Sequence, residues 1–139
     1  AVEKIAAARG ELVNVSGASD IALAGFDPVS FFKGGAPKNG SPMIRASYGG
    51  ATYLFADEQS KSEFESNPDR YAPQYGGFCA YGVSLGILLP VDITTAQVRN
   101  GKLYLNVNSA ILEKFNADFD GSVDRANENW PKLFAEHAE

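Results

Sequence analysis

The segment QYGGFCAYGVSLG, which runs from Gln74 to Gly86, holds the only cysteine of the chain, Cys79, among four glycines and two tyrosines. Because glycine adopts backbone conformations that other residues avoid, this density predicts tight turns on both sides of Cys79. A helical turn over Phe78 to Ser84 would place the thiol near a helix N-terminus. There the unpaired N–H groups and the helix dipole favour a thiolate, so we expect a lowered pKa for Cys79.

Two interpretations of this segment are open. In the first, the sulfur is a ligand or a target of oxidation, with Tyr75 and Tyr81 supplying phenolic oxygens and Ser84 a hydroxyl around it. In the second, Cys79 is simply packed, since free cysteine is among the most buried residue types and Cys-Ala between aromatic residues is typical of a close-packed turn. The spacing alone does not decide between a binding site and a turn.

The composition predicts one globular domain. A chain of 139 residues is long enough to bury a core but too short for two comfortable domains. Its hydrophobic fraction of 45% and charged fraction of 21% are ordinary for a folded protein, which excludes a largely disordered chain. No apolar run approaches the roughly 20 residues that a bilayer requires, so we expect no membrane span. The net charge of -5 and the scattered lysines and arginines exclude nucleic acid as a partner, because phosphate binding needs clustered positive charge.

The beginning of the sequence favours an exported protein. The first residue is Ala1, and the opening residues lack the basic and apolar regions of a signal peptide. We therefore expect that a leader has been removed and that the protein is periplasmic or secreted. A single cysteine excludes an intramolecular disulfide, which is compatible with export but does not require it.

Three segments in the first half have the features of helices. Residues 1–8 are rich in alanine, glutamate and lysine, which favours a short helix. Asp27 is typical of a helix cap and Pro28 of a first helical position, so a short helix is expected to run from here to the glycine pair at 34–35. Residues 57–66 predict a polar helix with Phe64 turned inward.

The C-terminal tail predicts one or two helices packed on a sheet. Its apolar residues, from Ile111 to Phe134, recur at spacings of three and four, as on one face of a helix. Pro131 interrupts this pattern, so we expect a helix break or a fresh helix start near Trp130.

Two segments predict antiparallel hairpins. Residues 44–48 and 52–55 flank the pair Gly49-Gly50, and residues 94–99 and 102–106 flank Asn100-Gly101, a strong hairpin turn sequence. In the last strand Leu103 and Leu105 alternate with more polar residues, so we expect one buried face. Together these elements predict an α+β fold of small antiparallel hairpins packed with short helices.

The chain has few residues for metal binding or catalysis. One cysteine, one histidine and one methionine (Met43) cannot form a zinc site of four cysteines, or of two cysteines and two histidines, within one chain. The serines lack the Gly-x-Ser-x-Gly elbow, and the glycines match neither a dinucleotide fingerprint nor a phosphate loop. We therefore expect a noncatalytic protein.

Three motifs resemble those of the secreted bacterial YHS domain proteins. They are YGGxxYxF from Tyr48, FxxNPxxYxPQYGGFCAY from Phe64, and GKLYLN from Gly101, with GFDPVSF at 25–31 and NWP at 129–131 extending the match. The resemblance implies a single YHS domain over 1–139. It implies a treble-clef or TRASH-related core at about 25–106, with helical extensions at 1–24 and 107–139.

The resemblance also implies a function. It points to a noncatalytic exported module that binds a metal ion, copper or another soft transition metal, or a small ligand, at a site centred on Cys79. Met43 is the one thioether that could join the thiolate, and Tyr75, Tyr81 and Ser84 complete the candidate pocket. The further cysteines of metal-binding relatives have no counterpart, since residues 54–56 occupy one such place. A homodimer would supply a second thiolate.

Two other functions remain open from the residues. The chain could be a protein-interaction or structural module whose cysteine is packed and inert. It could also be a thiol-based redox sensor or enzyme that uses Cys79 as a thiolate of low pKa.

Overall fold

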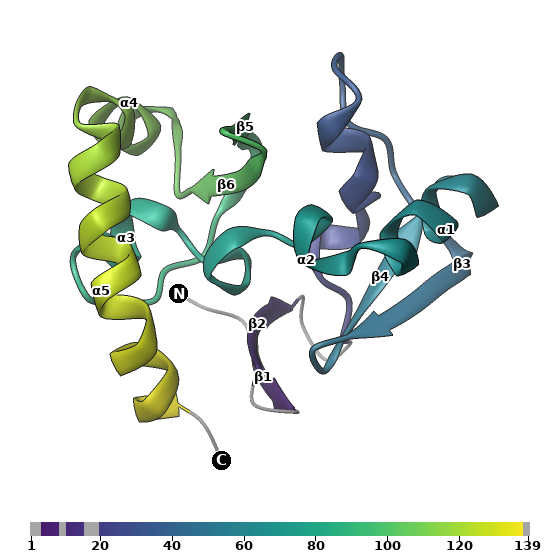
Figure 1. The fold of residues 1–139 in the computed structure, drawn as a ribbon, viewed down its shortest axis with the longest axis horizontal. Coiled ribbons are helices and arrows are strands. Elements are labelled where there is room, and N and C mark those ends of the chain that lie inside the picture. Colours follow the sequence, from purple (N-terminus) through teal and green to yellow (C-terminus); the bar gives the residue numbers. More distant parts are fainter. Residues whose placement is uncertain (1–3, 9–10, 16–19, 138–139) are drawn as a thin grey trace.

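The computed structural model describes residues 4–8, 11–15 and 20–137, which fold into paired strands and short helices with one long C-terminal helix (Figure 1). The strands form three antiparallel pairs: β1 (Lys4–Ala8) with β2 (Glu11–Val15), β3 (Ser41–Tyr48) with β4 (Ala51–Phe55), and β5 (Asp92–Arg99) with β6 (Lys102–Asn106). The helical elements are η1 (Leu23–Gly25), η2 (Pro28–Phe32), α1 (Glu58–Ser66), α2 (Pro68–Tyr71), η3 (Gln74–Gly77), α3 (Ala80–Ser84), α4 (Ser109–Ala117) and α5 (Phe119–His137). The expected α+β class with small antiparallel hairpins and short helices is confirmed. Within the described ranges, no helix combines the length and apolarity needed to cross a bilayer.

Both predicted hairpins form. Gly49 and Gly50 turn the chain from β3 to β4 with φ angles of 63° and 88°, which L side chains rarely adopt. Asn100 and Gly101 make the same kind of turn between β5 and β6, with φ angles of 56° and 74°. The turn residues identified in the sequence therefore set where these two strand pairs reverse.

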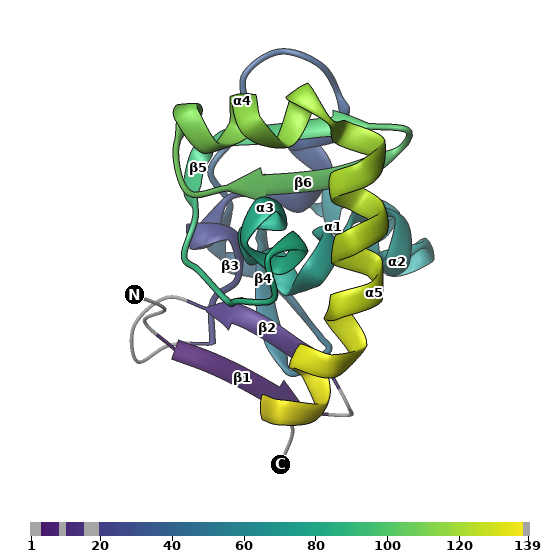
Figure 2. The same cartoon turned by 90° about the vertical axis from the view of Figure 1, so that its left-hand side faces the viewer.

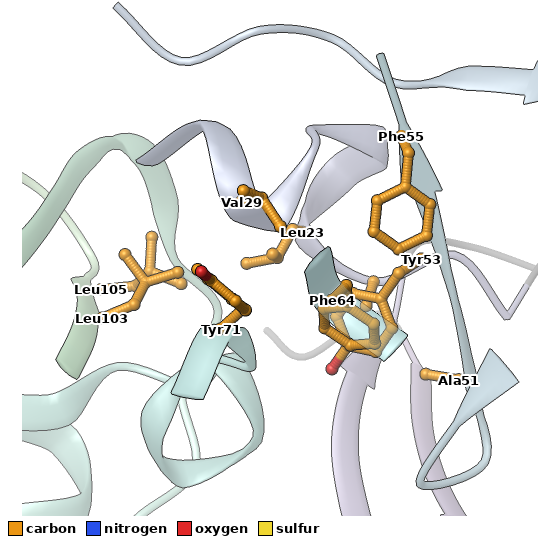
Figure 3. Close-up of a cluster of buried hydrophobic side chains, with 10 residues drawn as sticks. Leu23, Val29, Ala51, Tyr53, Phe55, Phe64, Tyr71, Leu103 and Leu105 are labelled. Carbon is orange, nitrogen blue, oxygen red and sulfur yellow. The ribbon is translucent and has the colours of Figure 1, made fainter. Parts of the chain in front are cut away.

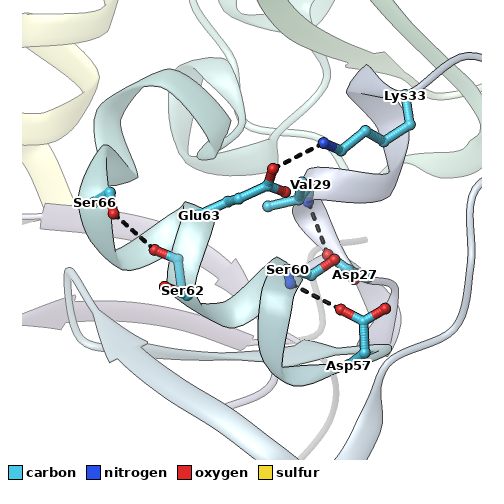
Figure 4. Close-up of polar contacts among 8 residues, drawn as sticks. All are labelled: Asp27, Val29, Lys33, Asp57, Ser60, Ser62, Glu63 and Ser66. Carbon is cyan, nitrogen blue, oxygen red and sulfur yellow. Dashed lines mark hydrogen bonds and ion pairs between the residues drawn. The ribbon is translucent and has the colours of Figure 1, made fainter.

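Asp27 is a buried carboxylate that joins two elements. Its Oδ1 accepts a hydrogen bond from the N–H of Val29 at 2.9 Å and so caps η2, whose first residue is Pro28, as predicted. Its Oδ2 accepts from the N–H of Ala56 at 2.9 Å, just after β4. Figure 4 shows this capping bond beside the equivalent bond at the start of α1, which Asp57 accepts from the N–H of Ser60. One side chain thus holds η2 against the end of the hairpin.

The first hydrophobic core lies between η2, α1 and the β3–β4 hairpin. Phe64 points inward from α1, as predicted, and its ring centroid lies 5.0 Å from that of Tyr53 and 5.3 Å from that of Phe55. Figure 3 shows these rings with Tyr71, Leu103 and the other buried members of the cluster. Because the rings meet at tilted angles, they gain the edge contacts that aromatic pairs prefer.

The second core lies under α5 in the other half of the molecule. Its buried members are Tyr75, Phe78, Ala80, Val83, Tyr104, Phe115, Phe119, Ala126 and Leu133. Helix α5 runs along this half beside α3 (Figure 2). The predicted helical C-terminal extension is therefore confirmed.

Strand β6 is buried on both faces, so the expected single buried face is wrong. Leu103 and Leu105 belong to the first core, whereas Tyr104, which points the opposite way along the strand, belongs to the second. Asn106 is also fully buried. The alternation along this strand predicts one face toward a core and one toward solvent, but it separates side chains of the first core from side chains of the second.

Two predicted helix features are wrong. The described part of residues 1–8 is strand β1, because pairing with β2 in register from Lys4–Val15 to Ala8–Glu11 overrides the helix preference of an alanine-rich segment. Within the predicted helical extension at 1–24, the described residues 4–8 and 11–15 are therefore paired strands, and the predicted processing at Ala1 lies outside the described residues. Helix α5 continues through Pro131, and the tail breaks instead at Asp118, between α4 and α5.

We predict that Asp27→Ala lowers the free energy of unfolding by about 3 kcal/mol, because it leaves two backbone N–H groups without their charged acceptor. Asp57→Ala is the matched control, since Asp57 is an exposed cap with one bond to the N–H of Ser60, and its loss should cost about 1 kcal/mol. Urea denaturation measures both. Equal losses for the two variants would contradict the role assigned to Asp27.

Candidate functional site

Cys79 is fully buried at the N-cap of α3. Its sulfur accepts a hydrogen bond from the N–H of Gly82 at 3.3 Å, and the thiol donates to Oδ1 of Asn106 over 3.5 Å. Its own N–H donates to the carbonyl of Leu89 at 3.1 Å. The predicted position of the thiol at the start of a helical turn is confirmed.

The pKa of the Cys79 thiol is raised, so the expected lowering is wrong. Burial disfavours the charged thiolate and outweighs the neighbouring backbone N–H groups of Gly82, Val107 and Tyr81, which favour it. The thiol is therefore protonated near neutral pH, where nucleophilic and metal-binding cysteines act as thiolates. This direction counts against the thiol-based redox or catalytic alternative.

Asn106 is the closest polar side chain to the sulfur. Its Oδ1 accepts a hydrogen bond from the N–H of Tyr81 at 3.0 Å in addition to the one from the thiol. This amide oxygen therefore links β6 to α3. Its Nδ2 is buried and has no hydrogen-bond partner among the described residues. The amide therefore faces the sulfur with an oxygen that already accepts two donors, and it offers no negative charge there.

The side chains of the other predicted pocket residues bond to other groups or lie far from the sulfur of Cys79. The Tyr75 hydroxyl donates to Oδ1 of Asn127 at 2.8 Å, and the Ser84 hydroxyl donates to the carbonyl of Tyr81. Met43 is 88% exposed on β3, and that strand lies at the opposite end of the molecule from α3 (Figure 1). Tyr81 lies near the sulfur through its backbone, whose N–H donates to Oδ1 of Asn106.

The donors around Cys79 do not fit a metal ion. The groups that face the sulfur are backbone N–H groups and an amide, which supply no second anionic or soft ligand. Within the described part of the chain, no group of three or more histidine, cysteine, aspartate or glutamate side chains could hold a metal. Metal binding at Cys79 stays an untested prediction, and the geometry counts against it.

A cleft of about 320 Å³ lies where the two cores approach each other. Its described lining combines five aromatic residues with polar and small ones: Tyr48, Tyr53, Asp69, Ala72, Pro73, Gln74, Tyr75, Gly76, Asn127, Trp130 and Phe134. Tyr53 belongs to the first core, and Tyr75 and Trp130 belong to or pack against the second. Strand β2 lies beside η3 and α5, which contribute walls of this cleft.

Polar groups in the cleft are held by hydrogen bonds. The hydroxyl of Tyr48 donates to Oδ1 of Asp69, which is the only ionisable carboxylate among the described lining residues. The pKa of the Tyr75 hydroxyl is raised, first by burial and then by the charges of Tyr104 and Asp124. Tyr75 therefore remains a neutral phenol that donates to Asn127 throughout the physiological pH range.

Of the predicted pocket residues, Tyr75 is the one that lines this cleft. The remaining lining residues were not predicted as site residues. The sequence patterns assign Tyr53 no site role and point to Trp130 only as the place of a helix break. A usable signal was present, because Tyr48, Tyr53, Tyr75 and Trp130 all lie within the quoted motifs. The sequence does not show that these residues meet, because they come from distant segments: Tyr48 and Trp130 are 82 positions apart.

We predict that Cys79 is alkylated by iodoacetamide at least about a hundredfold more slowly in the folded protein than in urea, because reaction needs local opening and a thiolate. In the folded protein the rate should keep rising above pH 9.0, the ordinary thiol value, because burial raises the pKa of Cys79. The exposed thiol of the double variant Cys79→Ser, Ala110→Cys is the control. Native alkylation of Cys79 as fast as this control would contradict the buried, protonated thiol.

Comparisons with family models, curated proteins and solved structures found no match for this chain. The likeness to YHS domain proteins therefore stays a prediction that rests on the quoted motifs.

Proposed function

We propose that this chain is a noncatalytic binding module that takes a small organic ligand in the cleft between its two cores. The observation that carries the proposal is the cleft itself, whose volume of about 320 Å³ is at the lower end of the range for small-molecule sites. Its mixture of aromatic walls and a few fixed polar groups is also typical of such sites. Cys79 then has a structural role, and the small-ligand part of the expected function moves from the sulfur to this cleft.

Backbone strain at Tyr75 supports a role for the cleft. Tyr75 has φ 56° and ψ 38°, a left-handed conformation that costs a residue with a side chain on the order of 1–2 kcal/mol. Gly76 and Gly77 follow with φ angles of 62° and 81°, where glycine is unstrained. The strain falls on Tyr75, the one aromatic residue of this turn that lines the cleft, and such strain is often found at functional sites.

The lining residues favour binding over catalysis. The described walls contain no histidine, cysteine or serine, so they offer no paired nucleophile and base. They do contain amide, phenol and carboxylate groups that could orient a ligand by hydrogen bonds. Export and homodimer formation stay predictions from the resemblance.

We predict that small aromatic or amine fragments shift the NMR signal of the Trp130 indole N–H in a saturable way. Ala72→Leu should weaken this binding by about tenfold or more, because the added side chain fills part of a cleft that Ala72 lines. Ala110→Leu, at an exposed position on α4, is the matched control and should leave binding unchanged. If no fragment in a broad set perturbs Trp130 or its neighbours, the proposed function is wrong.

We also predict that purified wild-type protein and Cys79→Ser retain equal amounts of metal after incubation with Cu(I) or Zn(II). The reason is that the buried thiol is protonated and has no second ligand beside it. Elemental analysis measures the bound metal. Near-stoichiometric metal that is lost in Cys79→Ser would instead establish Cys79 as a ligand.

A further inference from the structure

We propose that the ligand of the cleft is an organic cation of the ammonium class. This inference rests on the proposed function, and it adds the charge and chemical type of the ligand. Three features of the described lining support it: its aromatic side chains, its single negative charge and its lack of positive charge.

The aromatic walls can hold a cation through their rings. Five of the lining residues are aromatic: Tyr48, Tyr53, Tyr75, Trp130 and Phe134. Tyr75 and Trp130 pack edge-on, with ring centroids 6.1 Å apart and an angle of 63° between their planes, which holds both rings in place beside the cleft. Aromatic rings attract cations to their faces, so an aromatic lining favours a substituted ammonium group.

The charge of the cleft favours a cation over an anion. Asp69 is its only charged residue among the described lining residues, and no lysine or arginine contributes to those walls. Asp124 lies close enough to act on Tyr75 electrostatically, which adds a second negative charge nearby. An anionic ligand would meet repulsion here without a compensating donor of positive charge, whereas an ammonium group would be attracted by both carboxylates.

The polar geometry of the walls also suits a cation. The hydroxyl of Tyr48 fixes the carboxylate of Asp69, and the side-chain amide oxygen of Asn127 is held by the hydroxyl of Tyr75 at 2.8 Å. Pro131 has no N–H to donate to the carbonyl of Asn127, so this carbonyl lacks its normal helical donor at the border of the cleft. Carboxylate and carbonyl oxygens are acceptors, and acceptors are what a cationic ligand requires.

The experiment compares choline with 3,3-dimethylbutan-1-ol, which has nearly the same shape but no charge. Trp130 is the only tryptophan of the chain, so its intrinsic fluorescence reports directly on the cleft. We expect choline to change this fluorescence in a saturable way and to bind about tenfold more tightly than the neutral alcohol, which is the size of a desolvated cation–aromatic contact. The comparison uses the wild-type protein, so it does not depend on a variant that must fold.

Asp69→Asn tests the charge without changing the shape of the side chain. We expect it to weaken choline binding by about fivefold more than it weakens binding of the neutral alcohol, so that the preference for choline falls. Asp120→Asn, an identical change at an exposed position in the first turn of α5, is the matched control and should change neither. Near-UV circular dichroism confirms that both variants keep the packing around Trp130.

The outcomes separate this inference from the function on which it rests. Tighter binding of choline, with loss of that preference in Asp69→Asn, supports an ammonium ligand. Equal binding of choline and the alcohol, or no binding of choline while other fragments bind in the cleft, overturns the cation inference and leaves the binding function intact. If neither probe nor any fragment binds, both proposals are wrong.

Discussion

The burial of β6 on both faces is the constraint on which the rest of the structure depends. Leu103 and Leu105 enter one aromatic core and Tyr104 enters the other, so this single strand forms part of two interiors. A two-stranded hairpin is marginally stable by itself, and packing on both faces provides the burial that it needs. The apolar side chains that this strand presents in each direction contact α2 on one side, and α4 and the start of α5 on the other.

The environment of Cys79 follows from the same strand. Asn106, at the end of β6, accepts both the N–H of Tyr81 and the thiol of Cys79, and Cys79 forms a parallel bridge with Leu105. A small side chain with a weak donor and a weak acceptor satisfies this junction without a cavity. The only cysteine is thus explained by packing, and the glycines around it let the backbone turn close enough for these bonds to form.

Much of the local structure could be predicted, because it depends on short-range chemistry. The hairpin turns at Gly49-Gly50 and Asn100-Gly101 and the cap at Asp27 depend on backbone preferences and on bonds to residues nearby in the chain. Features decided by distant contacts were predicted wrongly or missed. Strand pairing overrode helix preference in residues 4–8, and burial overrode the N-cap environment in setting the pKa of Cys79. The cleft needs three distant segments at once, which no local pattern reports.

The cleft is a consequence of joining two cores through a short, strained connection. Residues 72–78 lead from the first core to the second, and Tyr75 reaches the cleft only in its left-handed conformation. Helix α5 continues past Pro131, and this keeps Trp130 beside Tyr75 and Phe134 in the same lining, whereas the predicted break would have allowed them to pack elsewhere. A second core that closed fully on the first would bury these rings without leaving a cleft. Strain at Tyr75 and a proline inside α5 are two local costs on adjoining walls of the cleft, and local costs of this kind are often found at functional sites.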